Sequence, residues 1–306
     1  MKTKRDFLKI GDLSLDELRK VLSLARTLKD EAKGTRVTTL AGRSVAVVLE
    51  KPSTRTRVSF EVGAAHLGAH PVVLTTDGSQ LARGEPIKDT ARVLSGYVDL
   101  IVYRTFADAR LAEMARYASV PVINALSDDG HPVQVLCDVF TIEEATKQPI
   151  EGKRVAFVGD CSSNMGRSFV EAAKIFDFHI ALAAPEGYMP PVAETEEAAK
   201  KGIVSFHKDG RSASAGAIAV NTDVWTSMGQ EAEQKRRLAT FAGWTLSEDA
   251  FADAAPGAIV LHCLPAHRGE EISEQLLEGP RSVVWAQAEN RLHVQKALML
   301  FLLGKA

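Results

Sequence analysis

Short β-branched runs alternate with amphipathic helical patterns along this chain, and that rhythm is what most constrains its fold. Strand-like runs in the first half are followed by stretches with apolar residues at helical spacing. Such alternation is typical of a parallel sheet covered by helices. The strand candidates are Ser44–Leu49, Pro71–Thr75, Leu100–Tyr103 and Pro121–Asn124, and the helix candidates are Thr54–Leu67, Ile87–Tyr97 and Ala107–Ala118.

The same rhythm starts again after a long helical stretch at 131–147, where Pro149 and Gly152 break the pattern. We therefore predict two parallel-sheet α/β domains, spanning residues 1–147 and 150–288. An apolar helix over Glu289–Leu303 ends the pattern. The second series comprises strands Arg154–Val158, Ile180–Ala184, Ala217–Asn221 and Ala258–Leu261 and helices Asn164–Phe176, Val192–Lys201 and Glu231–Thr240.

Composition narrows the class of protein. The chain has 306 residues and a net charge of -2, so nothing demands a nucleic-acid partner. Its 3 cysteines are few and odd in number, which argues against a disulfide framework or a zinc site. The first ten residues are charged, unlike a secretory signal, and no apolar run is long enough to span a bilayer. These features predict a soluble cytoplasmic protein with no membrane partner.

Hydroxyls and arginines gather where the first strand candidate meets the next helix, in the run Ser53-Thr54-Arg55-Thr56-Arg57. The N–H groups of a helix N-terminus attract anions, and an arginine can hold two phosphate oxygens at once. We expect Arg55 to face an anion and Arg57, two residues on, to be mainly structural. A capped helix carrying two solvated arginines is the alternative for this segment taken alone.

Three further segments place polar groups at strand ends or helix starts. Arg104 follows a strand candidate, and His131-Pro132-Val133-Gln134 opens the long helix with Pro132 at the first helical position. His262-Cys263-Leu264-Pro265 follows the last strand candidate. Each has an ordinary alternative: a loop arginine, a structural helix cap, and an inert cysteine. Their shared position suggests one polar ligand site, because ligands bind at the carboxyl ends of parallel strands.

Taken in order, these motifs resemble the signature of the aspartate/ornithine carbamoyltransferase family. The loop Asp223-x-x-x-Ser227-Met228-Gly229 and the segments 262–265 and 288–291 are similar to those of members that use ornithine. The resemblance extends over nearly the whole chain. It implies transfer of a carbamoyl group from carbamoyl phosphate to L-ornithine, giving citrulline and phosphate, in arginine metabolism.

The resemblance also implies residue roles. Arg104, His131 and Cys263 would act at the reacting groups. Ornithine would be held by Asn164, Asp223, Ser227 and Met228. Carbamoyl phosphate would be bound by Ser53, Thr54, Arg55, Thr56, Arg104, His131, Gln134, Cys263, Leu264 and Arg291.

The family architecture implies an active site in the cleft between the two domains, with the final helix, 289–306, packed back on the first domain. It also implies a homotrimer or an assembly of trimers. No cofactor and no metal are expected for the reaction. Four residues depart from the family's pattern, and the role of Arg83 in the 79–86 loop is unassigned. The departures are Gly130, Val133, Ser163 and Arg167.

Other functions remain open from the residues alone. A related enzyme could use aspartate, N-acetylornithine or putrescine, although a carboxylate at Asp223 suits an α-ammonium group and opposes an anionic acceptor. A non-catalytic binding homologue would keep the phosphate motif without turnover. A dinucleotide-dependent dehydrogenase is disfavoured, because the segment Gly159–Gly166 lacks the G-x-G-x-x-G spacing.

Overall fold

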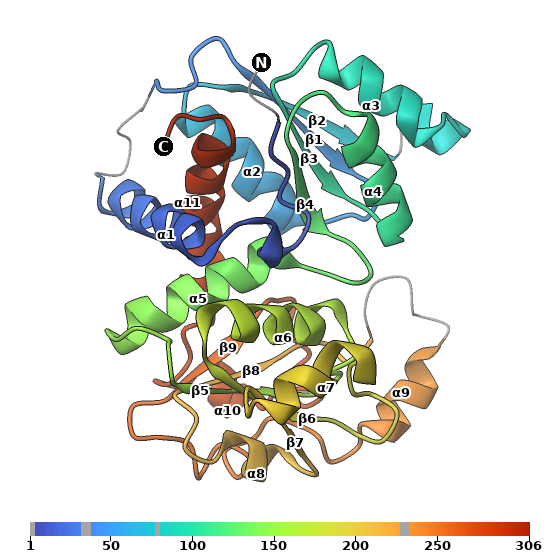
Figure 1. Ribbon diagram of the computed structural model, residues 1–306. Coiled ribbons are helices and arrows are strands. Elements are labelled where there is room, and N and C mark those ends of the chain that lie inside the picture. Colours follow the sequence, from blue (N-terminus) through green and yellow to red (C-terminus); the bar gives the residue numbers. More distant parts are fainter. Residues whose placement is uncertain (1–3, 32–37, 77–79, 227–232) are drawn as a thin grey trace. The chain divides into compact units, whose positions relative to one another are not determined.

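The computed structural model describes residues 4–31, 38–76, 80–226 and 233–306. The chain forms two compact units (Figure 1). The first contains residues 1–136 and 289–306, and the second contains residues 137–288. The predicted boundary at 147–150 lies after the helix α5 (Pro132–Thr146), whereas the division falls inside that helix.

The first unit is built on a four-stranded parallel sheet with the order β2-β1-β3-β4. Its central strand β1 runs through fully buried aliphatic residues, as expected of a strand covered on both faces. The strands are β1 (Ser44–Leu49), β2 (His70–Thr75), β3 (Leu100–Arg104) and β4 (Val122–Leu126).

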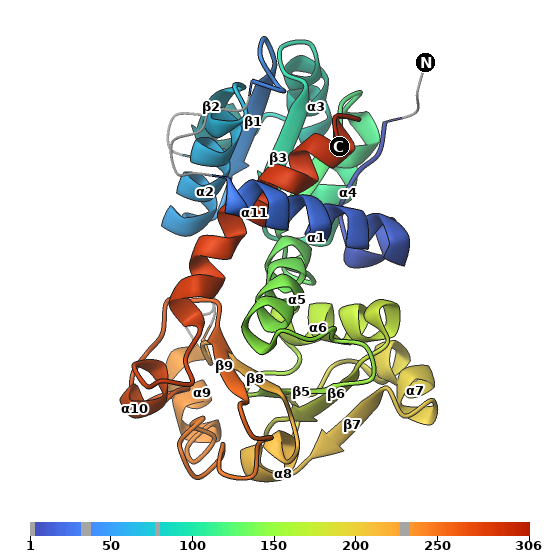
Figure 2. The ribbon, with the colours of Figure 1, turned by 90° about the vertical axis from the view of Figure 1, so that its left-hand side faces the viewer.

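Two helices, α3 (Ile87–Ser95) and α4 (Asp108–Tyr117), pack their apolar sides on one face of this sheet. The helices α1 (Leu15–Asp30), α2 (Thr54–His66) and α11 (Val284–Leu302) lie on the other side (Figures 1 and 2). The side chains of Lys296 and Met299 come within 3.4 Å of where a Cβ on Gly63 of α2 would stand. A small residue at this crossing lets α2 and α11 approach closely.

The second unit has a five-stranded parallel sheet with the order β7-β6-β5-β8-β9. Its strands are β5 (Arg154–Val158), β6 (His179–Ala183), β7 (Val204–His207), β8 (Ala219–Thr222) and β9 (Ile259–His262). Its remaining helices are α6 (Asn164–Phe176), α7 (Val192–Lys200), α8 (Gly210–Ser214), α9 (Gln234–Thr240) and α10 (Glu274–Leu277). In the described residues, no helix is long and apolar enough to cross a membrane.

The predicted fold class is confirmed as two parallel-sheet α/β units. Strands β1 and β5 and helix α6 match their predicted bounds residue for residue. The prediction missed β7, a short edge strand whose burial is only partial and whose apolar signal is correspondingly weak. It was wrong about the start of the last helix, which begins at Val284 and not at Glu289, because nothing between these residues breaks a helix.

A buried carboxylate connects β1, β3 and α4 in the first unit. Glu50, which is 7% exposed, accepts hydrogen bonds from the Tyr103 hydroxyl (2.8 Å), the Thr105 hydroxyl and the Arg110 guanidinium. Burial acts to raise the pKa of Glu50, but the hydrogen bonds from Arg110, Thr105 and Tyr103 outweigh it, so its pKa lies below the usual value. The ionised form is therefore the one that the fold stabilises.

Replacing Glu50 with Gln should lower the free energy of unfolding by about 2 kcal/mol near neutral pH, the scale of a hydrogen bond to a charged group. Because the pKa is lowered in the fold, this contribution is present above the unfolded value of about 4.3 and is lost as the pH falls below it. Denaturant unfolding of both proteins across pH 3 to 8 measures it. A difference between them that does not shrink toward acid pH contradicts this role.

Candidate active site

The N-terminus of α2 has the form of an anion-binding turn. Ser53 is its N-cap, and its hydroxyl accepts the Thr56 backbone N–H at 3.2 Å. The Ser53 hydroxyl also lies 3.1 Å from the hydroxyl of Thr56, and Thr54 begins the helix. Backbone N–H groups in the first turn of a helix lack carbonyl partners within it, and the helix dipole adds partial positive charge there. The turn therefore combines hydroxyl and N–H donors at one point.

Arg291 connects this turn with a second helix start. One of its terminal nitrogens donates to the Thr56 hydroxyl at 3.0 Å, and the other donates to the side-chain carbonyl of Gln134 at the start of α5. All three residues are at most 3% exposed. Three helices that are far apart in the sequence thus meet at a single guanidinium.

Arg104 and His131 belong to the same group of polar side chains, Arg104 as a cation and His131 as a neutral ring. Arg104 is the last residue of β3 and is 7% exposed, while His131 stands directly before α5, where its carbonyl accepts the N–H of Gln134 at 3.0 Å. Burial lowers the pKa of His131 well below its usual value, and the charges of Arg291, Arg104 and Arg55 lower it further. His131 is therefore neutral near pH 7. Arg291, Arg104 and Arg55 thus all act electrostatically on the same imidazole.

Arg55 and Arg57 take different directions, as their spacing on a helix predicts. Arg57 is on the solvent side, with its side chain 52% exposed and its Nε 3.4 Å from a carboxylate oxygen of Glu61. Such a solvent-exposed ion pair contributes little to the stability of the fold. Arg55 lies in the first turn of α2, close enough to His131 to lower its pKa.

Two residues just before this turn were missed from the sequence. The backbone N–H of Glu50 donates to the carbonyl of Arg104 at 2.9 Å, so its buried network also fixes the end of β3. Lys51, 6% exposed, donates to Asp128 at 2.6 Å and stands 4.6 Å from the centre of the Phe106 ring. Both residues directly follow a buried strand. Two charged residues at the carboxyl end of a buried strand are the sequence feature that could have identified them.

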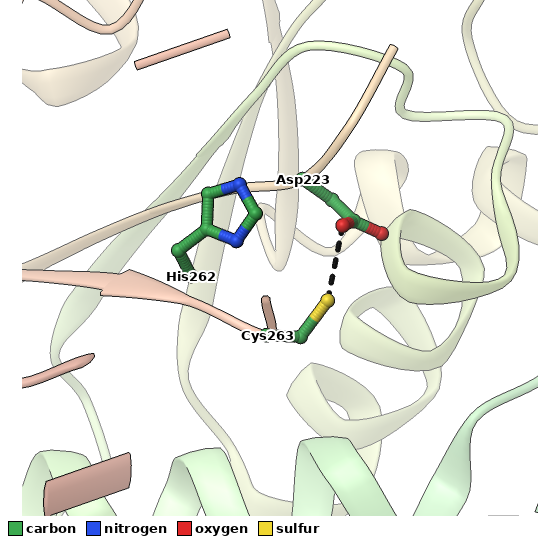
Figure 3. A group of neighbouring side chains, drawn as sticks. All are labelled: Asp223, His262 and Cys263. Atoms are coloured by element: carbon green, nitrogen blue, oxygen red, sulfur yellow. Dashed lines mark hydrogen bonds between the residues drawn. The ribbon is translucent and has the colours of Figure 1, made fainter. Parts of the chain in front are cut away.

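The second unit presents a different chemistry at the ends of β8 and β9 (Figure 3). The thiol of Cys263 donates to a carboxylate oxygen of Asp223 at 3.0 Å, and the same oxygen accepts the N–H of Val224 at 2.8 Å. Burial raises the pKa of Asp223, although His262 and the Cys263 thiol act in the opposite direction. A buried carboxylate with neutral donors is suited to a cationic ligand, which would offset its lost hydration.

Cys263 and Leu264 are positioned by the neighbouring histidine. The N–H of Leu264 donates to Nδ1 of His262 at 2.9 Å, so the ring proton is on Nε2, which donates to the fully buried Glu271 at 3.0 Å. Leu264 has a positive φ of 60°, a conformation that costs free energy for a residue with a side chain. The His262–Glu271 pair therefore fixes a strained loop that carries two of the predicted site residues.

Asn164 begins α6, next to a tightly packed loop. Ser163, one of the departures from the family's pattern, is the N-cap of this helix and accepts the N–H of Gly166 at 3.3 Å. A Cβ on Gly166 would stand 2.2 Å from the carbonyl oxygen of Cys161, so only glycine fits there. Arg167, another departure, forms an ion pair with Glu194 of α7.

Arg237 is a further residue that the sequence did not single out. It is 5% exposed, forms an ion pair with Asp160 and donates to the carbonyl of Trp225. Its guanidinium lies 5.0 Å from the ring centre of Tyr188 and 5.8 Å from that of Phe241. Arg237 thus holds the backbone at Trp225, within the first residues of the predicted ornithine loop. Ser227 and Met228 of that loop lie outside the described residues.

The predicted residues form two groups, one in each unit. Arg83, at the exposed end of the short 3-10 helix Gln80–Arg83, belongs to neither among the described contacts. The first group contains Ser53, Thr54, Arg55, Thr56, Arg104, His131, Gln134 and Arg291, and the second contains Asp223, Cys263 and Leu264. Asn164 belongs to the same unit as the second group and begins α6.

Comparison with known proteins covers almost the full chain. Residues 5–144 match the carbamoyl phosphate-binding domain of aspartate/ornithine carbamoyltransferases, and residues 151–302 match their aspartate/ornithine-binding domain. A Sorangium cellulosum protein named ornithine carbamoyltransferase is 67% identical, over 98% of each chain. A Geobacter metallireducens protein of the same name is 49% identical, over 98% of this chain and 99% of the relative.

Solved structures agree. The ornithine carbamoyltransferase of Pyrococcus furiosus has a TM-score of 0.92 at 42% identity, covering 99% of this chain and 98% of the other. That of Burkholderia thailandensis has a TM-score of 0.89 at 43% identity, covering 98% and 99%. Sequence motifs, fold and relatives agree, and the chain belongs to the aspartate/ornithine carbamoyltransferase family.

Proposed function

We propose that the chain transfers the carbamoyl group of carbamoyl phosphate to the δ-amine of L-ornithine, releasing citrulline and phosphate. The convergence of Arg291, Thr56 and Gln134 on one buried point, next to Arg55, Arg104 and His131, carries this proposal. The relatives named ornithine carbamoyltransferase support ornithine as the acceptor. The domain cleft, the trimer and the cytoplasmic location stay predictions of the family resemblance.

The phosphate side of the reaction needs positive charge in a dry environment. As the bond between the carbonyl carbon and the bridging oxygen breaks, charge passes to the phosphate. In this proposal Arg55 and the N–H groups at the start of α2 stabilise that negative charge, and the Ser53 and Thr56 hydroxyls are additional donors. Donors already fixed in the fold need little reorganisation during the reaction, which is the main source of such stabilisation.

The carbonyl oxygen gains negative charge when the amine attacks. A neutral His131 can donate a hydrogen bond to the carbonyl oxygen without first losing or gaining a proton. Its lowered pKa keeps the ring neutral near pH 7. Arg104 supplies a full positive charge from the end of β3. Gln134 already accepts a hydrogen bond from Arg291, so its amide NH₂ is orientated away from that guanidinium. We assign Gln134 to the carbamoyl group.

The acceptor side requires recognition of ornithine and a neutral attacking amine. Asp223 is the buried carboxylate that an α-ammonium group would satisfy, and an aspartate side chain would be repelled from it. The δ-amine nitrogen forms the new bond to carbon, and its proton goes to the departing phosphate, so no strong protein base is needed. Cys263, whose thiol donates to Asp223, orientates that carboxylate and does not act as a nucleophile.

The proposal as a whole is tested by measuring citrulline-type products with four amines at equal concentration: L-ornithine, aspartate, N-acetylornithine and putrescine. Ornithine should give the highest kcat/KM, by about a hundredfold or more, because it alone combines a free α-amino acid head, whose ammonium suits Asp223, with a free δ-amine. A faster reaction with another amine would contradict the acceptor assignment. Binding of carbamoyl phosphate with no turnover of any amine would contradict an enzymatic function.

Replacing Arg55 with Ala should reduce kcat/KM for carbamoyl phosphate by about a hundredfold, equivalent to about 3 kcal/mol for an unpaired buried charge. Arg57→Ala is the matched control, because its guanidinium faces solvent on the same helix. The control should keep its activity within about threefold. If the Arg55→Ala variant also keeps its activity within about threefold, Arg55 does not bind the phosphate.

Replacing Asp223 with Asn should separate stability from binding. Its pKa is raised in the fold, so the folded protein loses stability as the pH rises from the unfolded value of about 3.9 through the folded one. Asn avoids this loss, and the variant should be more stable than the original protein at pH 7. Its KM for ornithine should nevertheless rise at least about tenfold, because a charged partner is lost. Equal stability at every pH, or an unchanged KM, would refute this assignment.

A further inference from the structure

A second cluster of chemically active side chains lies in the loop after β9, beyond Cys263 and Leu264. Nδ1 of His267 is 3.7 Å from one carboxylate oxygen of Glu271 and 3.8 Å from a carboxylate oxygen of Glu270. One imidazole nitrogen and two carboxylate oxygens thus face one another, all within 4.8 Å. The proposed transfer reaction uses none of these three residues.

Glu271 is the unusual member of this cluster, because it is fully buried while one of its oxygens lacks a donor. Its Oε1 accepts both Nε2–H of His262 at 3.0 Å and the backbone N–H of His267 at 2.6 Å. Its Oε2 is buried and accepts no hydrogen bond from any described residue. That oxygen is the one facing His267. A buried carboxylate oxygen without a partner is costly, and a bound cation would remove the cost.

No arginine or lysine in the described part of the chain neutralises the two acids. The nearest cation in sequence, Arg268, is directed to α10, where it contacts Glu278 at 2.5 Å and Glu274 at 3.8 Å. Within residues 4–31, 38–76, 80–226 and 233–306, the ion pairs of Glu270 and Glu271 are formed only with histidines. The cluster therefore keeps an excess of negative charge at a point where three ligand atoms meet.

We propose that His267, Glu270 and Glu271 form a binding site for a divalent transition-metal ion of the zinc type. Imidazole and carboxylate are both established zinc ligands, and bonds of about 2.0–2.2 Å put neighbouring ligand atoms roughly 3.3–3.6 Å apart in a tetrahedron. The two distances from His267, 3.7 and 3.8 Å, need only a small contraction, and the two carboxylates lie within 4.8 Å of each other, a gap that a turn of the exposed Glu270 side chain can close. The side chains of His267 and Glu270 are 49% and 39% exposed, which gives the ion a path from solvent and leaves a fourth position for water.

The cation would act on the active-site loop through Glu271. The same carboxylate that offers Oε2 to the metal holds His262 through Oε1, and His262 holds the strained backbone at Leu264. A metal ion bound to Oε2 thus fixes the Glu271 side chain and makes residues 262–271 more rigid. It has no part in carbamoyl transfer itself.

The group Asp223, His262 and Cys263 could also take up zinc, through the thiolate. The test therefore starts from the Cys263→Ser variant, in which that route is removed. Zinc affinity is measured by competition with a chromophoric chelator and, independently, as the zinc-induced rise in unfolding temperature. Cobalt binding adds a spectroscopic control, since only the Cys263 group gives thiolate-to-metal absorption.

In the Cys263→Ser background, one zinc ion per chain should bind and raise the unfolding temperature. Adding His267→Ala or Glu270→Gln should weaken binding by at least about tenfold, the lower end of the loss seen when mere supporting groups are removed. Glu274→Gln, an exposed acid that contacts Arg268, is the matched control and should bind zinc like its parent.

Two results would overturn the site. Loss of all zinc binding in Cys263→Ser alone would assign the metal to the Asp223 group. Equal zinc affinity with and without His267→Ala and Glu270→Gln would show that these side chains are not ligands. Unfolding curves recorded without zinc establish that each variant is folded, which the exposure of both side chains leads us to expect.

Discussion

A single buried guanidinium organises the first unit. Arg291 donates to Thr56 on α2 and to Gln134 on α5, and it comes from α11 at the far end of the chain. Burying a charge is unfavourable unless it is surrounded by hydrogen-bond acceptors or an opposite charge. Thr56 and Gln134 supply neutral acceptors for it. In the proposed function the phosphate of carbamoyl phosphate adds negative charge beside it, so the contact that joins three helices also favours the ligand.

Parallel sheet topology explains why the other cationic groups gather there. Strands β1 and β3 are neighbours, and Leu49 pairs with Arg104 at their carboxyl ends. The turn into α2 and the end of β3 are therefore adjacent. Glu50 connects them, because its backbone N–H donates to Arg104 and its buried carboxylate accepts from Tyr103 and Arg110. Burial and the charges of Arg291, Arg104 and Arg55 keep the His131 imidazole neutral, so it adds no further positive charge to this group.

Two buried acids give the second unit its chemistry, and their surroundings separate their roles. Asp223 meets a thiol and a backbone N–H, both neutral donors, so it remains suited to an ammonium ligand. Glu271 meets His262 and the backbone of the same loop with one oxygen, and His267 with the other. Asp223 is the acid that we propose for substrate binding, whereas Glu271 holds the loop that contains Cys263 and Leu264.

The sequence by itself determined the α/β class and most element positions, because hydrophobic periodicity is a local signal. It also indicated the anion-binding turn at Ser53–Arg57, since capping and helix polarity depend on neighbouring residues. Pairing across the fold was decided only by tertiary structure. Examples are the Arg291 contacts, the Arg237–Asp160 pair and the half-satisfied carboxylate of Glu271. The partners of Arg291 and Arg237 lie at least 77 residues away from them in the chain. The burial that sets the charge states of all these groups exists only after the chain has folded.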